Sequence, residues 1–213
     1  MKALIIGATG ATGKDLLKVL LNDPYYTSVS AFVRRPMGLT HPKLKEIITD
    51  FEKPEEVSEE INGDILFSCL GTTLKDAGSK ERQWKIDHDI PARFTSIGRS
   101  HGISIMVLLS AYGASTASRI FYSKMKGSLE EKIKEMNFAT LIIFRPGLLV
   151  RKNTDRAGER ISARVLRMMN SLGWMKKFRP LPTEVLAEKM ALAPKAFPSG
   201  THFISLDSIF YVQ

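Results

Sequence analysis

Apolar runs rich in β-branched residues alternate with amphipathic stretches along the chain. The runs predict strands at residues 3–6, 29–33, 46–49, 65–70, 103–110, 140–144 and 203–206. Apolar positions three or four apart predict helices at residues 14–22, 54–61, 81–101, 118–136, 162–172 and 183–193. The central runs are apolar on both faces, so they need cover on both sides of a parallel sheet. We therefore expect one doubly wound, mostly parallel α/β domain over residues 1–213.

The first apolar run leads directly into Gly7-Ala8-Thr9-Gly10-Ala11-Thr12-Gly13. A strand that turns sharply into a helix beside a pyrophosphate needs residues without a Cβ at the turn, at the phosphate and at the helix-strand contact. The helix N-terminus behind the loop favours anions through its free N–H groups and its dipole. This segment predicts a dinucleotide-binding loop, with these expected contacts: Gly7, Thr9, Gly10, Ala11, Thr12 and Gly13.

The pair Gly13-Lys14 also resembles the phosphate loop of nucleoside triphosphatases. That pattern requires glycine where Ala8 stands and a magnesium-binding hydroxyl where Asp15 stands. An extra carboxylate beside phosphates is repulsive, so the triphosphatase interpretation is rejected.

The second predicted strand ends in Arg34-Arg35 instead of an acidic residue. An acid there would bind the ribose 2′-hydroxyl of NAD, whereas a guanidinium pairs with the 2′-phosphate of NADP. Arg34 is the first candidate and Arg35 the second, and two ordinary surface arginines remain the alternative. NADP(H) is therefore preferred over NAD(H) as the cofactor.

Two later strand ends offer supporting contacts to the adenosine half of the cofactor. Asp50-Phe51 follows the third strand and Leu70-Gly71-Thr72 follows the fourth. A carboxylate can accept from the adenine amine, and a glycine lets backbone approach the ribose. Asp and Gly are also common in plain turns, so that interpretation stays open for each.

Tyr122 and Lys126, near the start of a predicted helix, are candidate catalytic residues. Residues four apart on a helix lie on one face, so Lys126 can stabilise a Tyr122 phenolate and reach a ribose hydroxyl. Ser110 ends the preceding strand and can hydrogen-bond the substrate oxygen on which Tyr122 acts. After the next strand, Pro146 and Gly147 offer backbone beside a nicotinamide ring.

With these positions the chain resembles the short-chain dehydrogenase/reductase superfamily, in particular its atypical branch and the Tat-interacting-protein-like oxidoreductases. The matching motifs are Gly7-x-x-Gly10-x-x-Gly13, Ser110, Tyr122-x-x-x-Lys126 and Arg145-Pro146-Gly147. The resemblance implies a Rossmann fold that binds NADPH, with Ser110, Tyr122 and Lys126 in catalytic positions. The chain departs from many members in having Cys69-Leu70-Gly71-Thr72 where they have Asn-Asn-Ala-Gly, and no asparagine can be assigned to their proton relay.

The net charge of +9 is concentrated in the C-terminal third, where residues 145–213 hold 12 Lys and Arg against 5 Asp and Glu. Four arginines recur there at helical spacing and form an arginine stripe: Arg156, Arg160, Arg164 and Arg167. A solvated helix face, attraction for an anionic cofactor or substrate, and an acidic protein, membrane or nucleic-acid partner all stay open for this stripe. Residues 148–182 are the least regular and are expected to form a small elaboration over the crevice, on the substrate side. Within it, an apolar pocket or core packing is open for Met168, Met169, Trp174 and Met175.

Several sites are not expected. The four histidines His41, His88, His101 and His202 lack metal-ligand spacing, and the single cysteine, Cys69, lies in an apolar run as a buried thiol. No nucleic-acid motif accompanies the basic charge, and no secretory leader or membrane-spanning stretch is found, so neither partner is expected and a cytoplasmic protein is predicted.

Three functions follow from these features. An NADPH-dependent oxidoreductase acting on a small carbonyl substrate uses every motif. Sugar-nucleotide epimerisation or dehydration needs a larger second lobe than the short C-terminal part supplies. A regulator that binds NADP(H) and a protein partner, with little or no catalysis, needs the loop and Arg34 but not Ser110, Tyr122 and Lys126 together.

Overall fold

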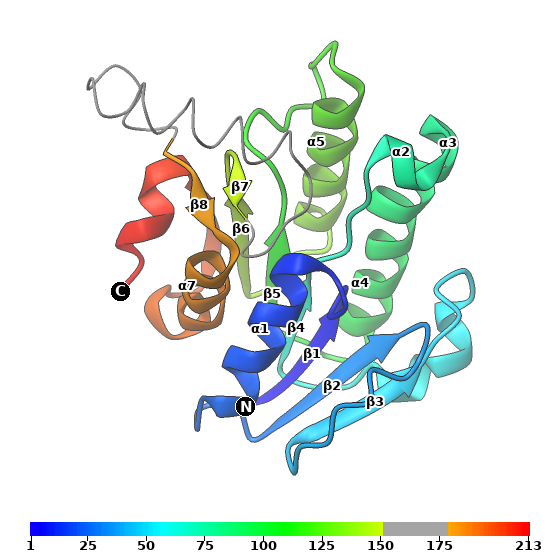
Figure 1. Ribbon diagram of the computed structural model, residues 1–213, viewed down its shortest axis with the longest axis vertical. Helices are drawn as coiled ribbons and strands as arrows, with labels where there is room; N and C mark the ends of the chain where they lie inside the picture. The colour runs from blue at the N-terminus through cyan, green and yellow to red at the C-terminus, as the bar shows by residue number, and fades with distance from the viewer. Residues whose placement is uncertain (151–178) are drawn as a thin grey trace.

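The protein was analysed as a computed structural model, which describes residues 1–150 and 179–213 (Figure 1). Within these ranges, the main sheet has seven parallel strands in the order β3-β2-β1-β4-β5-β6-β9. Their bounds are β1 Lys2–Ile6, β2 Ser28–Val33, β3 Leu44–Ile48, β4 Ile65–Ser68, β5 Ile105–Leu109, β6 Thr140–Arg145 and β9 Gly200–Ser205. All seven predicted strands are therefore confirmed to within a few residues, and so is the doubly wound parallel fold.

A second, two-stranded pair was not predicted from the sequence. It consists of β7, Leu149–Val150, and β8, Leu181–Pro182, which run parallel to each other. Strands of two residues carry no recognisable period, so the pattern could not indicate them.

Four longer helices flank the sheet: α1 Ala11–Asn22, α4 Ile90–Ser100, α5 Phe121–Lys134 and α7 Thr183–Ala196. The helix predicted at residues 54–61 is a 3₁₀ segment instead, η1 Pro54–Glu60, because Val57 leaves helical dihedral angles. The helix predicted at 81–101 divides into α3 Lys80–Trp84, a π-turn η2 Lys85–Asp89, and α4. Two short elements, α2 Leu74–Ala77 and η4 Leu206–Tyr211, were not predicted, and the helix expected at 162–172 lies outside the described residues.

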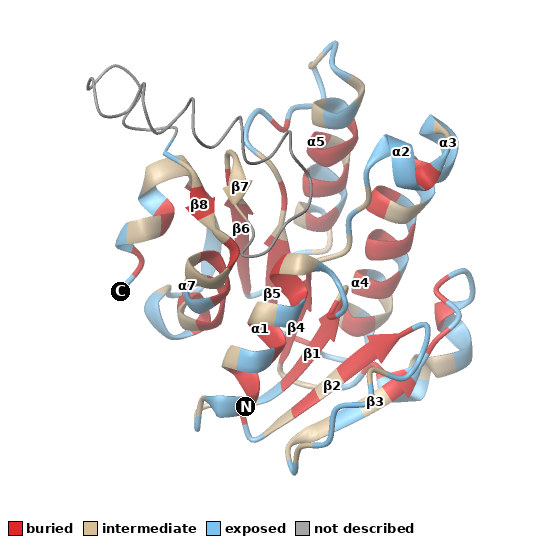
Figure 2. Cartoon of the chain, viewed as in Figure 1, coloured by how far each residue is buried: buried red, intermediate tan, exposed pale blue. Residues whose placement is uncertain are grey.

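Alternate strand residues supply two separate hydrophobic cores, one on each face of the sheet. In β1, Ala3 and Ile5 pack under α1 and α7, whereas Leu4 and Ile6 pack under α4 and α5. Figure 2 accordingly shows the central strands largely buried and the outer helix faces exposed. This two-sided cover is what the apolar runs required.

The strand order reverses at β1 and β4, which are neighbours although β2 and β3 lie between them in sequence. In open parallel sheets, ligands bind in the crevice beyond the carboxyl ends of the strands at such a reversal. Gly7 follows β1, Leu70 follows β4 and Ser110 follows β5. The fold therefore brings the predicted site residues to the same edge of the sheet.

Candidate functional site

The loop after β1 has the geometry of a close backbone crossing. Gly7 has a positive φ of 83°, and a Cβ there would lie 2.5 Å from the Cys69 carbonyl carbon. A Cβ on Gly13 would lie 2.0 Å from the Gly7 carbonyl oxygen. Both positions exclude any side chain, because the atoms in the way belong to the backbone.

Gly10 is different, since it is exposed and a Cβ there would meet only the Gly7 carbonyl oxygen at 3.3 Å. It is also the N-cap of α1, and no side chain caps that helix or puts an acid in its first turn. Thr9 is exposed, whereas Thr12 is buried. The helix N-terminus next to Ala11 thus presents uncapped N–H groups, which suit a phosphate.

Arg34 and Arg35 follow β2 and are both exposed. Neither guanidinium forms an ion pair with any residue that the structure describes. The following turn is held by Glu46, whose carboxylate accepts from the Met37 N–H at 3.0 Å. Two unpaired cations at the end of β2 fit the predicted contact with a 2′-phosphate.

The two residues after β3 do not both face a ligand. Phe51 is buried and packs 6.2 Å from the Phe94 ring of α4, so its expected role at the adenine edge is corrected to core packing. Asp50 is exposed, but one of its oxygens closes a turn by accepting from the Glu52 N–H at 2.9 Å. Its other oxygen is still available to a ligand.

Ser110 meets a partner that the sequence analysis missed. Its hydroxyl donates to the buried carboxylate of Glu130, which also accepts from the Arg145 guanidinium. Arg145 in turn stacks on Phe203 of β9, 4.4 Å from its ring centre. Because a serine hydroxyl carries one hydrogen, Ser110 in this arrangement offers only acceptor lone pairs to anything else.

Tyr122 and Lys126 lie on one face of α5, as their spacing predicts. The Lys126 ammonium lies 5.8 Å from the centre of the Tyr122 ring, and Lys126 is buried while Tyr122 is exposed. Lys124, two residues after Tyr122, is exposed. The pair therefore combines a solvent-exposed phenol with a buried ammonium group next to it.

A second missed residue is Asp87, in the π-turn. It is fully buried, with its carboxylate 3.5 Å from the Lys126 ammonium and 2.7 Å from the Thr72 N–H that donates to it. Burial raises the pKa of Asp87, and the Lys126 charge acts in the opposite direction. No motif indicated Asp87, because only the π-turn brings it to α5.

The remaining predicted contacts lie at the ends of β4 and β6. Gly71 is exposed, Leu70 is half-buried and Thr72 is tied to Asp87. The Pro146 carbonyl accepts from the Tyr112 N–H at 2.9 Å, which fixes the loop after β6 against the loop after β5. A Cβ on Gly147 would come within 3.1 Å of the end of the Leu206 side chain, which would have to move by a few tenths of an ångström to admit it.

Cys69 follows β4, directly against the glycine loop. Burial raises the pKa of its thiol to about 12, and the Lys126 charge acts in the opposite direction. The thiolate is therefore scarce at neutral pH, which agrees with the structural role that was predicted.

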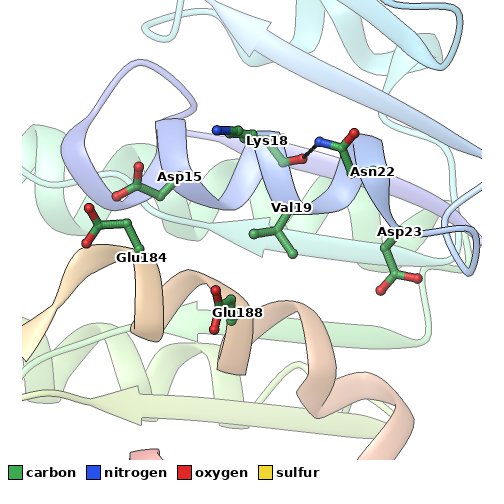
Figure 3. A pocket seen from close by; sticks show the side chains of 7 residues that line it. All are labelled: Asp15, Lys18, Val19, Asn22, Asp23, Glu184 and Glu188. Carbon is green, nitrogen blue, oxygen red and sulfur yellow. Dashed lines mark hydrogen bonds between the residues drawn. The ribbon is translucent and has the colours of Figure 1, made fainter.

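A separate hollow of about 700 Å³ lies between α1 and α7 (Figure 3). Asp15 and Glu184 point toward one another across it, with Glu188 one turn further along α7. Asp23, at its end, pairs with Lys195 at 2.5 Å. Among the described residues no group of three or more metal-binding side chains was found, here or elsewhere. Asp15 thus faces α7, and the hollow is distinct from the glycine loop.

Three predictions concern the segment after β7. The arginine stripe, the methionine and tryptophan group and most of the expected 148–182 elaboration fall in residues 151–178, outside the described residues.

Comparison with known proteins identifies relatives by sequence. A family profile described as NAD(P)H-binding matches residues 7–161. The mitochondrial protein FMP52 of Saccharomyces cerevisiae is 33% identical over 160 residues, which cover 73% of this chain and 68% of that protein. Protein HTATIP2 of Rattus norvegicus is 34% identical over 160 residues, which cover 73% of this chain and 66% of that protein.

Solved structures share the fold at low sequence identity. A short-chain dehydrogenase/reductase superfamily protein of Agrobacterium tumefaciens, with bound NAD, superimposes with a TM-score of 0.74 at 13% identity, covering 97% of this chain and 77% of that one. The oxidoreductase ylbE of Lactococcus lactis has a TM-score of 0.67 at 19% identity, covering 92% and 85% of the two chains.

The relatives contradict the predicted cytoplasmic location. FMP52 proteins of four yeasts and filamentous fungi, at 33–38% identity, are named mitochondrial. The prediction was wrong because it rested on the lack of a secretory leader and of a spanning segment, and neither feature separates the cytosol from the mitochondrion. Within the described ranges, no helix has both the length and the apolar character needed to cross a bilayer.

Proposed function

The chain belongs to the NAD(P)H-binding family, with atypical short-chain dehydrogenase/reductase-like relatives, and on this premise we propose that it is an NADPH-dependent reductase of a small carbonyl compound. The observation that carries the proposal is the buried Lys126 ammonium 5.8 Å from the exposed Tyr122 ring. A phenol beside a buried cation suits proton transfer at a reacting oxygen.

The chain's residues fit the cofactor at both of its phosphate positions. Gly10 is open to solvent at an uncapped helix N-terminus, which suits a pyrophosphate. Arg34 is exposed at the end of β2, and no ion pair joins its guanidinium to the part of the chain that the structure describes, which suits the 2′-phosphate that distinguishes NADPH from NADH.

Each polar residue then has a role in carbonyl reduction. When bound, NADPH supplies the hydride that the carbonyl carbon accepts. Tyr122 donates its phenolic proton to the carbonyl oxygen, and Lys126 stabilises the phenolate that remains. Ser110 has to turn its hydroxyl from Glu130 to the substrate if it is to donate to that oxygen, and otherwise it accepts from the alcohol product.

The first experiment tests the cofactor. Fluorescence titration of wild type and Arg34→Ala with NADPH and NADH is expected to show that the variant binds NADPH about tenfold or more weakly, because charge-assisted hydrogen bonds are lost. Its NADH affinity is expected to stay within about twofold, and Lys124→Ala is the matched control for removing an exposed cation. Tighter binding of NADH than of NADPH by wild type would refute the preference.

The second experiment tests the reaction. Wild type and Tyr122→Phe are compared in a screen of aldehydes and ketones that measures NADPH oxidation. Tyr122→Phe is expected to lose about 10²–10⁴-fold in kcat while keeping its NADPH affinity, because it lacks the proton donor. Equal turnover by wild type and Tyr122→Phe would remove Tyr122 from the reaction.

A second candidate is a regulator whose NADP(H) occupancy changes its affinity for an acidic protein partner. It is favoured by the Ser110 hydroxyl, which is engaged by Glu130, and by the basic excess of the C-terminal third. Tight NADPH binding with no turnover of any carbonyl compound would support this candidate over the reductase.

A further inference from the structure

Asp87 is a buried carboxylate with one oxygen satisfied and one not. Its Oδ1 accepts the Thr72 N–H at 2.7 Å, whereas its Oδ2 has no hydrogen-bond partner among the described residues. The Lys126 ammonium is 3.5 Å from Oδ2, too long for an ordinary charged hydrogen bond but within ion-pair range. Asp87 side-chain exposure is 1% and that of Lys126 is 3%, so water can screen neither charge.

Lys126 needs this counter-charge, because an unpaired buried ammonium costs several kcal/mol. Glu130 is a buried carboxylate on the same helix as Lys126, but it is already bonded to Arg145 and Ser110. Asp87 therefore supplies the counter-charge of the Lys126 ammonium.

The π-turn fixes Asp87 in place. The next residue, His88, lies 3.1 Å from the Ser128 hydroxyl of α5 through one ring nitrogen and 2.8 Å from Asp89 through the other. Its ring also packs 4.7 Å from the Trp84 ring. The turn is thus attached to α5 at Lys126 by Asp87 and at Ser128 by His88.

Asp87 also reaches the loop after β4. Besides the Thr72 N–H bond, a Cβ on Gly71 would lie 3.6 Å from Asp87 Oδ2 and 3.8 Å from Lys126 Nζ. The Thr72 carbonyl accepts from the Gln83 amide at 3.1 Å, which closes the same loop from α3. One carboxylate therefore joins the loop after β4 to the lysine of α5.

We propose that Asp87 is a positioning residue, which holds the Lys126 ammonium at the nicotinamide side of the cofactor and fixes it to the Gly71-Thr72 loop. This inference rests on the proposed function, because it takes NADPH as the molecule that Lys126 contacts. Asp87 itself, being buried beneath Lys126, touches neither cofactor nor substrate.

The test separates the two halves of the cofactor without measuring turnover. Calorimetric titration with NADPH is compared with adenosine 2′,5′-bisphosphate, which has the 2′-phosphate but no nicotinamide. Asp87→Asn keeps an acceptor for the Thr72 N–H and removes the counter-charge of Lys126. It is expected to bind NADPH about tenfold more weakly and the bisphosphate within about twofold of wild type.

A double-mutant cycle shows whether Asp87 acts through Lys126. Lys126→Met is expected to weaken NADPH binding about tenfold or more, and Asp87→Asn with Lys126→Met is expected to bind no more weakly than Lys126→Met alone. Additive losses, equal losses for the bisphosphate, or Asp87→Asn within twofold of wild type would overturn the proposal. If Asp87→Asn does not fold, Asp87→Ser, which also retains an acceptor, takes its place in the same cycle.

Wild type that binds neither NADPH nor the bisphosphate would refute the proposed function and this inference together. NADPH binding that depends on Arg34 and Lys126, but not on Asp87, would refute this inference alone.

Discussion

Gly7, Gly10 and Gly13 differ in how strictly the backbone around them excludes a side chain. Gly7 adopts a positive φ against the Cys69 backbone, and Gly13 packs on the Gly7 carbonyl. Gly10 has neither constraint, and its one close neighbour is the Gly7 carbonyl oxygen at 3.3 Å. Gly7 and Gly13 are therefore required by the backbone packing of the fold, whereas Gly10 leaves the surface of the loop accessible to a ligand.

Gly13→Ala is expected to lower the free energy of unfolding by about 1–3 kcal/mol, because its Cβ would overlap backbone that cannot move aside. Urea denaturation measures the loss. Gly10→Ala is the matched control, expected to remain within about 1 kcal/mol of wild type while binding NADPH more weakly. Equal stability of wild type and Gly13→Ala would contradict this prediction, because it would mean that the Gly7 backbone can move aside for the added Cβ.

The spacing of glycine, tyrosine and lysine made much of the site predictable, because these residues act through local backbone geometry or along one helix. Asp87 could not be predicted, since a π-turn changes which face of a helix a residue occupies. Phe51 was misassigned because a residue after a strand can turn into the core as well as toward a ligand. Glu130 carried a usable signal, being four residues after Lys126 on the same face.

At the scale of elements, α5 organises the site. Tyr122, Lys126 and Glu130 succeed one another at intervals of four along it, with Glu130 fully buried against Ser110 and Arg145. The carboxylate thereby joins α5 to the ends of β5 and β6. The partners of Glu130 stand where the apolar runs of two strands stop, since Ser110 follows β5 and Arg145 ends β6.

Glu130→Leu is expected to destabilise the protein by about 3–5 kcal/mol, because it leaves the Arg145 guanidinium without its carboxylate. Adding Arg145→Met should recover most of this loss, since both charges are then gone. Thermal or urea unfolding of the single and double variants makes the comparison. A double variant as unstable as Glu130→Leu would show that packing, and not charge, governs this site.

At the scale of the whole molecule, the two ends of the chain share one core. The buried Tyr26 hydroxyl donates to the Ala191 carbonyl of α7 at 2.6 Å, and Asp23 pairs with Lys195. Burial raises the pKa of Tyr26 far above its ordinary value of 10.0, as it raises that of Cys69 from 9.0 to about 12.

Stability is therefore expected to fall in alkaline solution. Both folded groups keep their protons above the pH at which the unfolded chain loses them, so the free energy of unfolding declines from about pH 9 upward, by as much as about 1.4 kcal/mol per pH unit for each group. Tyr26→Phe should cost about 1 kcal/mol at pH 8 and reduce the decline above pH 10. Urea unfolding between pH 8 and 11 measures both, and parallel curves for wild type and variant would contradict the assignment to Tyr26.

The shared core beneath α1 and α7 also has a consequence for synthesis on the ribosome. The α1 leucines share a core with Leu186 and Met190, and they gain these neighbours only after α7 has been synthesised, long after α1 itself. Until then this face of the sheet lacks the part of its cover that α7 supplies, and it presents apolar surface to chaperones or to other nascent chains. The glycine loop, which leads into α1, therefore depends for its fixed shape on a helix that is synthesised long after it.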